Sequence, residues 1–132
     1  MSTRQFIYET LSGYTPIQTL VADRVFQGES LRNSMQAKPF LVYRMGNDTD
    51  LNFAERDAFP HQWFFQVHAH DEPADYSQVD NLITLSIASF RAAIVPADSG
   101  ILQVRYLETS RDLDDQVLGT IMRYARFQLI MN

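Results

Sequence analysis

The sequence predicts an α+β fold, with an antiparallel or mixed sheet of about four strands, two helices packed on one face and a long β-hairpin loop. Two observations lead to this class. Apolar residues recur at helical spacing near the N-terminus and again after residue 75, and paired strand-like segments flank that second helix. A chain of 132 residues without internal repeats suits a single domain, residues 1–132.

Two helices and a short strand are predicted before the first long loop. From Thr3 to Ser12 the apolar side chains share one helical side, and Gly13 supplies a stop. Thr15-Pro16 begins a second, short helical turn, because proline fits the first turn of a helix. Val25-Phe26 is interpreted as a short strand, and the polar stretch 27–38 as a loop.

Two further strands form the predicted hairpin. Pro39 to Met45 is β-branched and aromatic, and His61 to His70 alternates in polarity. The connection from Gly46 to Pro60 is about three times as long as an ordinary hairpin loop. The apolar residues of the second strand share one face; they are Trp63, Phe65, Val67 and Ala69.

A long helix and two strands complete the predicted fold. The helix runs from Asp75, where Asp75 or Ser77 can cap it, to about Ile94. Ile101 to Thr109 alternates, and Leu118 to Met131 is the last strand. The helix stripe expected to face inward is Val79, Leu82, Ile83, Ser86, Ile87, Phe90 and Ile94, and the matching face of the next strand is Leu102, Val104 and Tyr106. The residues expected to be buried are Val79, Ile83, Ile87, Phe90, Phe65, Val67, Val104 and Phe127.

Composition excludes several classes of function. The formal net charge of −5 argues against general nucleic-acid binding, which relies on Lys and Arg to neutralise phosphates, so we expect no sequence-specific nucleic-acid partner. The absence of cysteine excludes disulfides, thiolate metal sites and a thiol nucleophile. No apolar run approaches the ~20 residues of a membrane span, and the N-terminus lacks a signal-peptide core. We therefore expect no membrane partner and a cytoplasmic place of assembly.

No catalytic signature is present in the sequence. His68 and His70, followed by Asp71 and Glu72, resemble metal ligands on one strand face, but no third ligand lies at a familiar spacing. The Gly-x-Ser-x-Gly pattern and a Gly-rich phosphate loop are both missing. The acidic segment 111–116 does not fit an EF-hand loop and is interpreted as a solvated turn. We expect no catalytic residue, no metal and no cofactor.

The long loop and the acidic turn are the candidate interaction elements. A loop that places aromatic residues beside charges is typical of an interface, although it could also fold back onto its own domain. Arg44, Arg105, Arg123 and Arg126 on strands, together with the acidic turn, would allow head-to-tail pairing between copies. The candidate interface residues are Asp48, Asp50, Leu51, Phe53, Arg56, Asp57, Phe59, Arg111, Asp112, Asp114 and Asp115.

The order and character of the elements resemble a known family. The landmarks are Gly13 followed by Leu20–Phe26, the Lys38–Arg44 strand opening, Trp63–Ala69 leading into Asp75-Tyr76, and Glu108–Asp115 before Arg126-Phe127. This layout resembles the tail terminator or tail-completion proteins of long-tailed bacteriophages, the minor tail protein U-like group. The likeness spans Thr3 to Met131.

The resemblance implies a structural role in the virion. Proteins of this family are α+β domains that form a hexameric ring on the head-proximal end of the tail tube, stop its polymerisation and offer a joining surface to the head connector. The implied partners are further copies of the chain, the tail tube protein and the connector or neck protein. The alternatives are another phage neck or connector protein, a small metal-dependent enzyme using His68, His70 and Asp71, or a ligand-binding or regulatory domain of the host.

Overall fold

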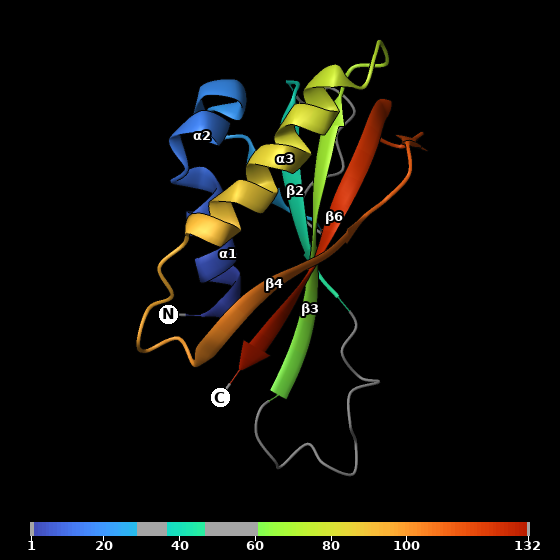
Figure 1. The fold of residues 1–132 in the computed structure, drawn as a ribbon. Coiled ribbons are helices and arrows are strands. Elements are labelled where there is room, and N and C mark those ends of the chain that lie inside the picture. The colour runs from blue at the N-terminus through green and yellow to red at the C-terminus, as the bar shows by residue number, and fades with distance from the viewer. Residues whose placement is uncertain (1, 29–36, 47–60, 132) are drawn as a thin grey trace.

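The structure is a computed structural model that describes residues 2–28, 37–46 and 61–131. Three helices and six strands follow one another in the described residues (Figure 1). Their bounds are α1 Thr3–Ser12, α2 Thr15–Val21, β1 Val25–Gln27, β2 Phe40–Met45, β3 His61–Asp71, α3 Ser77–Ala92, β4 Ile101–Thr109, β5 Leu113–Asp115 and β6 Thr120–Met131.

The strands form one mixed sheet in the order β1-β2-β3-β6-β4, and β5 pairs with the beginning of β6. Among the described strands, β1 and β2 run parallel and the other pairs are antiparallel. The longest ladder joins β3 to β6, from His61 opposite Met131 to Asp71 opposite Ile121. The predicted α+β class is confirmed. The sheet has six strands instead of about four, because the short β1 and β5 extend it.

All three helices cover one face of the sheet (Figure 1). Phe90 of α3 lies over Phe65 and Phe127, which stack on neighbouring strands with ring centroids 4.9 Å apart. Phe6 of α1 reaches the same cluster, 6.2 Å from the ring of Phe90. These rings join both helices to the sheet, so the core lies between the helical layer and the inner face of β3 and β6.

Local signals set the helix ends. The side chain of Ser2 accepts a hydrogen bond from the backbone N–H of Gln5, which caps α1. At the end of α3, Ala93 adopts extended backbone angles. The helix therefore ends before Ile94, whose side chain is 91% exposed. The expectation that Ile94 lies on the inward stripe is wrong, because the helical period continues in the sequence beyond the helix itself.

The core expectations are otherwise largely met. Of the eight residues expected to be buried, Ile87 and Val104 are half-buried and the other six are buried. Leu102 was expected to face inward but is 59% exposed. The register of β4 on β6 shifts between Ile101 and Gln103, so Leu102 lies in a bulge that interrupts the alternation.

The acidic segment also differs from its expected form. Residues Leu113–Asp115 form β5 and pair with Thr120–Met122, so the turn lies at residues 116–119 instead of 111–116. Gly119 has a positive φ of 67° and closes this turn. The last strand accordingly begins at Thr120, two residues after the predicted start at Leu118. Leu118 packs against Phe40 and Val42 on the face of the sheet opposite the helices.

Candidate interaction surface

The two histidines of β3 share one face of the sheet, as predicted, but they are buried there. His68 stacks on Tyr124 with ring centroids 5.0 Å apart, and His70 stacks on Phe40 at 4.8 Å. The Nδ1 atom of His70 is hydrogen-bonded to the hydroxyl of Thr120 at 2.7 Å. Burial lowers the pKa of His68 to about 3 and that of His70 to about 4, so both rings are neutral at pH 7.

This packing does not favour a metal site. Each imidazole is already engaged by an aromatic ring and by a side-chain hydrogen bond, since Gln66 is bonded to His68 at 2.9 Å. Among the residues that the structure describes, no group of three His, Cys, Asp or Glu side chains gathers around a common point. His68 and His70 are buried because the strand continues to Asp71 and because Leu118 packs on the same side of the sheet, against Phe40 and Val42.

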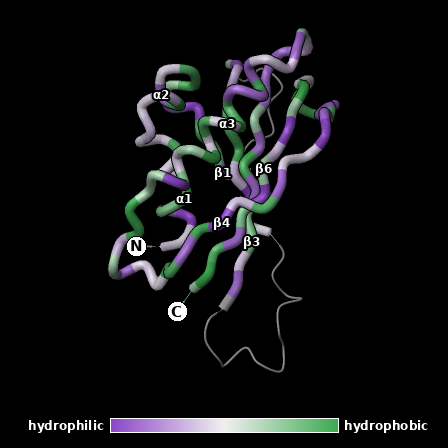
Figure 2. The backbone as a smooth tube through the Cα atoms, in the orientation of Figure 1, coloured by the Kyte–Doolittle hydropathy of each residue, from purple (hydrophilic) through white to green (hydrophobic). Residues whose placement is uncertain are grey.

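The predicted acidic segment lies at one end of the sheet, beside the connection from β3 to α3. Asp71 and Asp114 both pair with Ile121, from the strands on either side of β6. The hydroxyl of Tyr76 donates a 3.0 Å hydrogen bond to the carbonyl oxygen of Leu113, which ties the two segments together. Figure 1 shows both segments at the same end of the sheet, and Figure 2 shows hydrophilic residues there. We call this surface the acidic end; its residues are Asp71, Glu72, Asp75, Asp112, Asp114 and Asp115.

Arg123 holds the acidic end to the helical layer. Its guanidinium donates 3.0 and 2.8 Å hydrogen bonds to the carbonyl oxygen of Ser110 and a 2.7 Å bond to Asp80 of α3, and it lies 3.5 Å from Asp112. The Oδ1 atom of Asp115 accepts a 2.9 Å bond from the backbone N–H of Leu118. Arg111 and Asp114 remain exposed. Arg123 therefore fixes the domain internally and is not available for the head-to-tail role that the sequence suggested.

The remaining strand arginines gather on the open face of the sheet. Arg44, Gln66 and Arg126 lie side by side on β2, β3 and β6, and Arg105 lies opposite Gln128, which pairs with Phe64. The guanidinium carbon of Arg126 lies 4.6 Å from the centre of the Phe64 ring. We call this surface the arginine face; its residues are Arg44, Phe64, Gln66, Arg105, Arg126 and Gln128.

Sequence reasoning named the arginines of this face but missed their neighbours. Gln66 and Gln128 point to the same side as the arginines because they occupy alternate positions of paired strands. Gln128 also donates a 2.7 Å hydrogen bond to Gln62 across the sheet. Strand alternation could have identified both amides once the pairing of β3 with β6 was known.

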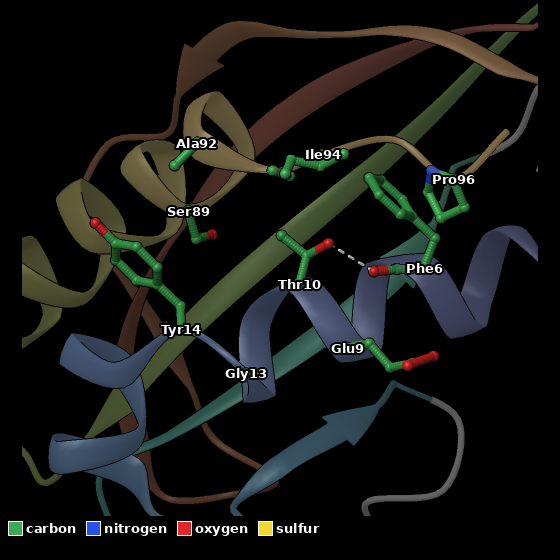
Figure 3. Close-up of a pocket in the computed structure, with 10 residues that line it drawn as sticks. Phe6, Glu9, Thr10, Gly13, Tyr14, Ser89, Ala92, Ile94 and Pro96 are labelled. Carbon is green, nitrogen blue, oxygen red and sulfur yellow. Dashed lines mark hydrogen bonds between the residues drawn. The ribbon is translucent and has the colours of Figure 1, made fainter.

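The groove in the helical layer is lined by few reactive side chains. A groove of about 320 Å³ lies between α1 and the end of α3 (Figure 3). The hydroxyl of Thr10 donates to the carbonyl oxygen of Phe6 at 2.7 Å, and that of Ser89 donates to Ser86 at 2.7 Å, so both are used within their own helices. Among the described residues that line the groove, Glu9 alone is charged. This arrangement provides neither a nucleophile with a base nor a set of metal ligands.

The long-loop candidates lie outside the described residues. This applies to Asp48, Asp50, Leu51, Phe53, Arg56, Asp57 and Phe59. The strands on either side of the loop, β2 and β3, pair antiparallel, as the two strands of a hairpin do. The interface role of the loop therefore stays a prediction.

Comparisons with known proteins identify a fold and no sequence family. Neither protein-family models nor curated proteins match the sequence. Among solved structures, the one titled "Structure of bacteriophage SPP1 gp17 protein" is similar with a TM-score of 0.62 and 12% sequence identity, over 98% of this chain and 88% of that chain. This chain shares the fold of SPP1 gp17. Within the described residues, no helix has the length and hydropathy of a membrane span.

Proposed function

We propose that this chain is a structural virion protein of a tailed bacteriophage. In this role it forms a ring, expected to be a hexamer, on the head-proximal end of the tail tube, where it stops tube polymerisation and presents a surface to the head connector. The observation that carries the proposal is the fold shared with bacteriophage SPP1 gp17 along nearly the whole chain. The family resemblance of the sequence, read from its order of elements, points to the same class.

The described surface supports a role in binding over one in catalysis. The only histidines whose side chains the structure describes are buried and neutral at pH 7, while charged side chains are displayed at the acidic end and on the arginine face. Displayed charges without a catalytic pair suit a protein that works by contact.

The test is complementation of a phage that lacks this gene. We expect infected cells to accumulate unjoined heads and tails of irregular length, and the wild-type chain supplied in trans to restore joined particles of uniform tail length. Electron microscopy of the particles measures both properties. Normal tails and normal joining without the chain would contradict the proposal.

The station in the neck can be tested separately. A tail terminator should be found on tails purified from cells that cannot make heads, whereas a connector protein should be found on heads purified from cells that cannot make tails. Immunoblotting of both preparations with an antibody to the chain decides between them. Recovery on heads alone would favour the alternative of a head connector protein.

The long loop provides a sharper prediction. We expect Phe53→Ala combined with Phe59→Ala to impair joining, because apolar anchors at interfaces typically cost about 2 kcal/mol or more on truncation. In a ring the loss recurs at every subunit contact. Tail length and head joining in the complementation assay measure the effect. Ile94→Ala, which removes an exposed apolar side chain elsewhere, is the control. Normal particles from the loop variant would show that these two aromatic residues are not anchors.

A further inference from the structure

We infer that copies of this chain pair head to tail, with the acidic end of one copy against the arginine face of the next. The inference deepens the proposed ring and rests on that function for its biological setting. It names the two surfaces that would meet and the chemistry that joins them.

The arginine face has the opposite sign to the chain as a whole. The net charge of the chain is −5, yet Arg44, Arg105 and Arg126 share one sheet face on which Glu108 is paired with Arg126 at 3.4 Å. Among the described residues, ion pairs engage Arg126 but neither Arg44 nor Arg105. The helices lie on the other side of the sheet, so no described helix covers these two side chains (Figure 1). Both side chains are exposed in the part of the chain that the structure describes.

Exposed apolar side chains accompany the arginines. The second register shift of β4 on β6 lies between Tyr106 and Glu108, so Leu102 and Leu107 both occupy bulges on the edge strand. Their side chains are 59% and 37% exposed, on either side of Arg105 in the sequence. Edge strands and bulges are positions where a sheet is open to a partner. The edge of the arginine face thus combines positive charge with apolar contact area.

The acidic end offers the complementary combination. Glu72, Asp75 and Asp114 are exposed there. Val117, in the turn between β5 and β6, is 74% exposed beside the acidic residues. Hydrogen bonds from the hydroxyl and the backbone N–H of Ser77 lower the pKa of Asp75, which keeps this carboxylate charged in mild acid. An anionic surface with an apolar tip matches a cationic surface with apolar edges.

The acidic end and the arginine face of one copy lie too far apart to pair with each other. Ile121, at the acidic end, and Arg126, on the arginine face, are five residues apart on one extended strand, a span of roughly 17 Å. This exceeds the Debye length of about 10 Å at 0.1 M salt, so the two surfaces neutralise one another weakly within a copy. Because they are different patches of the same molecule, their contact is heterologous and generates a ring when the rotation closes.

The test uses two charge-reversed variants of the full chain. The first reverses the arginine face with Arg44→Glu and Arg105→Glu; the second reverses the acidic end with Glu72→Arg and Asp114→Arg. Sedimentation velocity at low and high salt measures self-association, and thermal unfolding verifies that each variant is folded. We expect the wild-type chain to associate more strongly at low salt, and each variant to associate on the order of tenfold more weakly or worse.

Mixing the two variants is the decisive measurement. In an equal mixture, the reversed arginine face meets the reversed acidic end, and the two unaltered surfaces also meet, so we expect association to return. The matched control is Arg91→Glu compared with Arg105→Glu alone, because both arginines are exposed and only Arg105 lies on the arginine face. A mixture of folded variants that stays monomeric, or equal weakening by Arg91→Glu and Arg105→Glu, would overturn the inference.

Two other outcomes also count against the inference. A wild-type chain that stays monomeric at low salt and high concentration would overturn it, even if complementation of the phage succeeds and the proposed function stands. The wild-type chain could instead bind duplex DNA without self-associating. If Arg44→Glu combined with Arg105→Glu abolished that binding, the arginine face would be assigned to nucleic acid instead.

The inference and the proposed function can also fail separately. If self-association depends on these charges but complementation of the phage fails, the pairing is supported and the proposed function is contradicted.

Discussion

At the scale of single residues, the buried histidines are the most consequential titratable groups. His68 is 9% exposed and His70 is 2% exposed, and desolvation makes both hard to protonate in the folded chain. The mutual repulsion of the two rings and Arg44 lower the pKa of His68 further, while Asp115 acts in the opposite direction. The packing of the rings therefore favours their neutral form, and both rings are neutral in the folded chain at pH 7.

This packing predicts acid lability. The unfolded chain binds protons at these histidines below pH 6.5, whereas the folded chain does not until about pH 4, so the free energy of unfolding should fall as the pH drops through this window. We expect a loss on the order of 5 kcal/mol between neutral pH and about pH 4.5, from two histidines over about two pH units. Urea unfolding across this range measures it.

The control replaces both imidazoles with amides. His68→Gln combined with His70→Gln removes the titration and leaves hydrogen-bonding groups near Gln66 and Thr120. This double variant should lose less stability over the same range. Equal slopes for wild type and variant would show that the histidines do not drive the acid response. Alanine at these buried positions would add cavities and confuse the result.

At the scale of elements, the turn between β5 and β6 depends on one backbone conformation. Gly119 has a φ of 67°, and a Cβ built on it would meet nothing within 4 Å. A substitution there is therefore opposed by the backbone angle alone and not by crowding. The turn carries Leu118 onto Phe40 and Val42, so the angle also determines how the second small apolar cluster closes.

We accordingly expect Gly119→Ala to destabilise the fold by about 1 kcal/mol, the usual cost of a left-handed conformation for a residue with a side chain. Gly119→Asn should cost less, because asparagine tolerates this region better. The midpoint of thermal unfolding measures both. A melting temperature unchanged by alanine would contradict the assigned conformation.

The elements also show what local sequence can and cannot predict. The bounds of α1 were predicted as found, because its periodicity and the following Gly13 are local signals. Leu102 was misplaced because a bulge depends on the register with β6, which lies about 30 residues further along the chain. The burial of His68 and His70 was missed for the same reason, since residues from β2 and β6 surround them.

The charged surfaces also show which features local sequence can predict and which depend on distant residues. Arg123 was grouped with Arg126, although three positions on a strand place side chains on opposite faces, and alternation alone could have separated them. Asp71 and Asp114 both lie opposite Ile121, on the two sides of β6. This placement could not be predicted, because it requires the β3–β6 and β5–β6 pairings together. Local pattern therefore predicted the charged residues, and nonlocal pairing arranged them.

At the scale of the whole molecule, one core joins every layer. Phe90 of α3 contacts the rings of Phe6, Phe65 and Phe127, which belong to α1, β3 and β6. A domain whose helices and sheet share the same buried side chains is expected to unfold as a unit. Helical signal and sheet signal should then be lost together.

Phe90→Ala tests this cooperativity. We expect it to destabilise the chain by about 3–5 kcal/mol, as truncation of a buried Phe does. Circular dichroism of the helices and fluorescence of Trp63, the single tryptophan, should move to lower urea by the same amount. Ile94→Ala, an exposed apolar residue four positions away, should leave both curves in place. Separated transitions in the Phe90 variant would show that the layers unfold independently.

The position of β6 has a consequence for the time course of folding. β6 fills the gap between β3 and β4, and the residues that it joins to β3 are 50 or more positions apart in the chain. During folding, the β2–β3 hairpin can form early, but the other edge of β3 stays unpaired until the distant segment arrives. Such nonlocal pairing slows folding and leaves an open strand edge exposed to other chains meanwhile. When many copies are synthesised together, aggregation should be most frequent in the period before β6 pairs with β3.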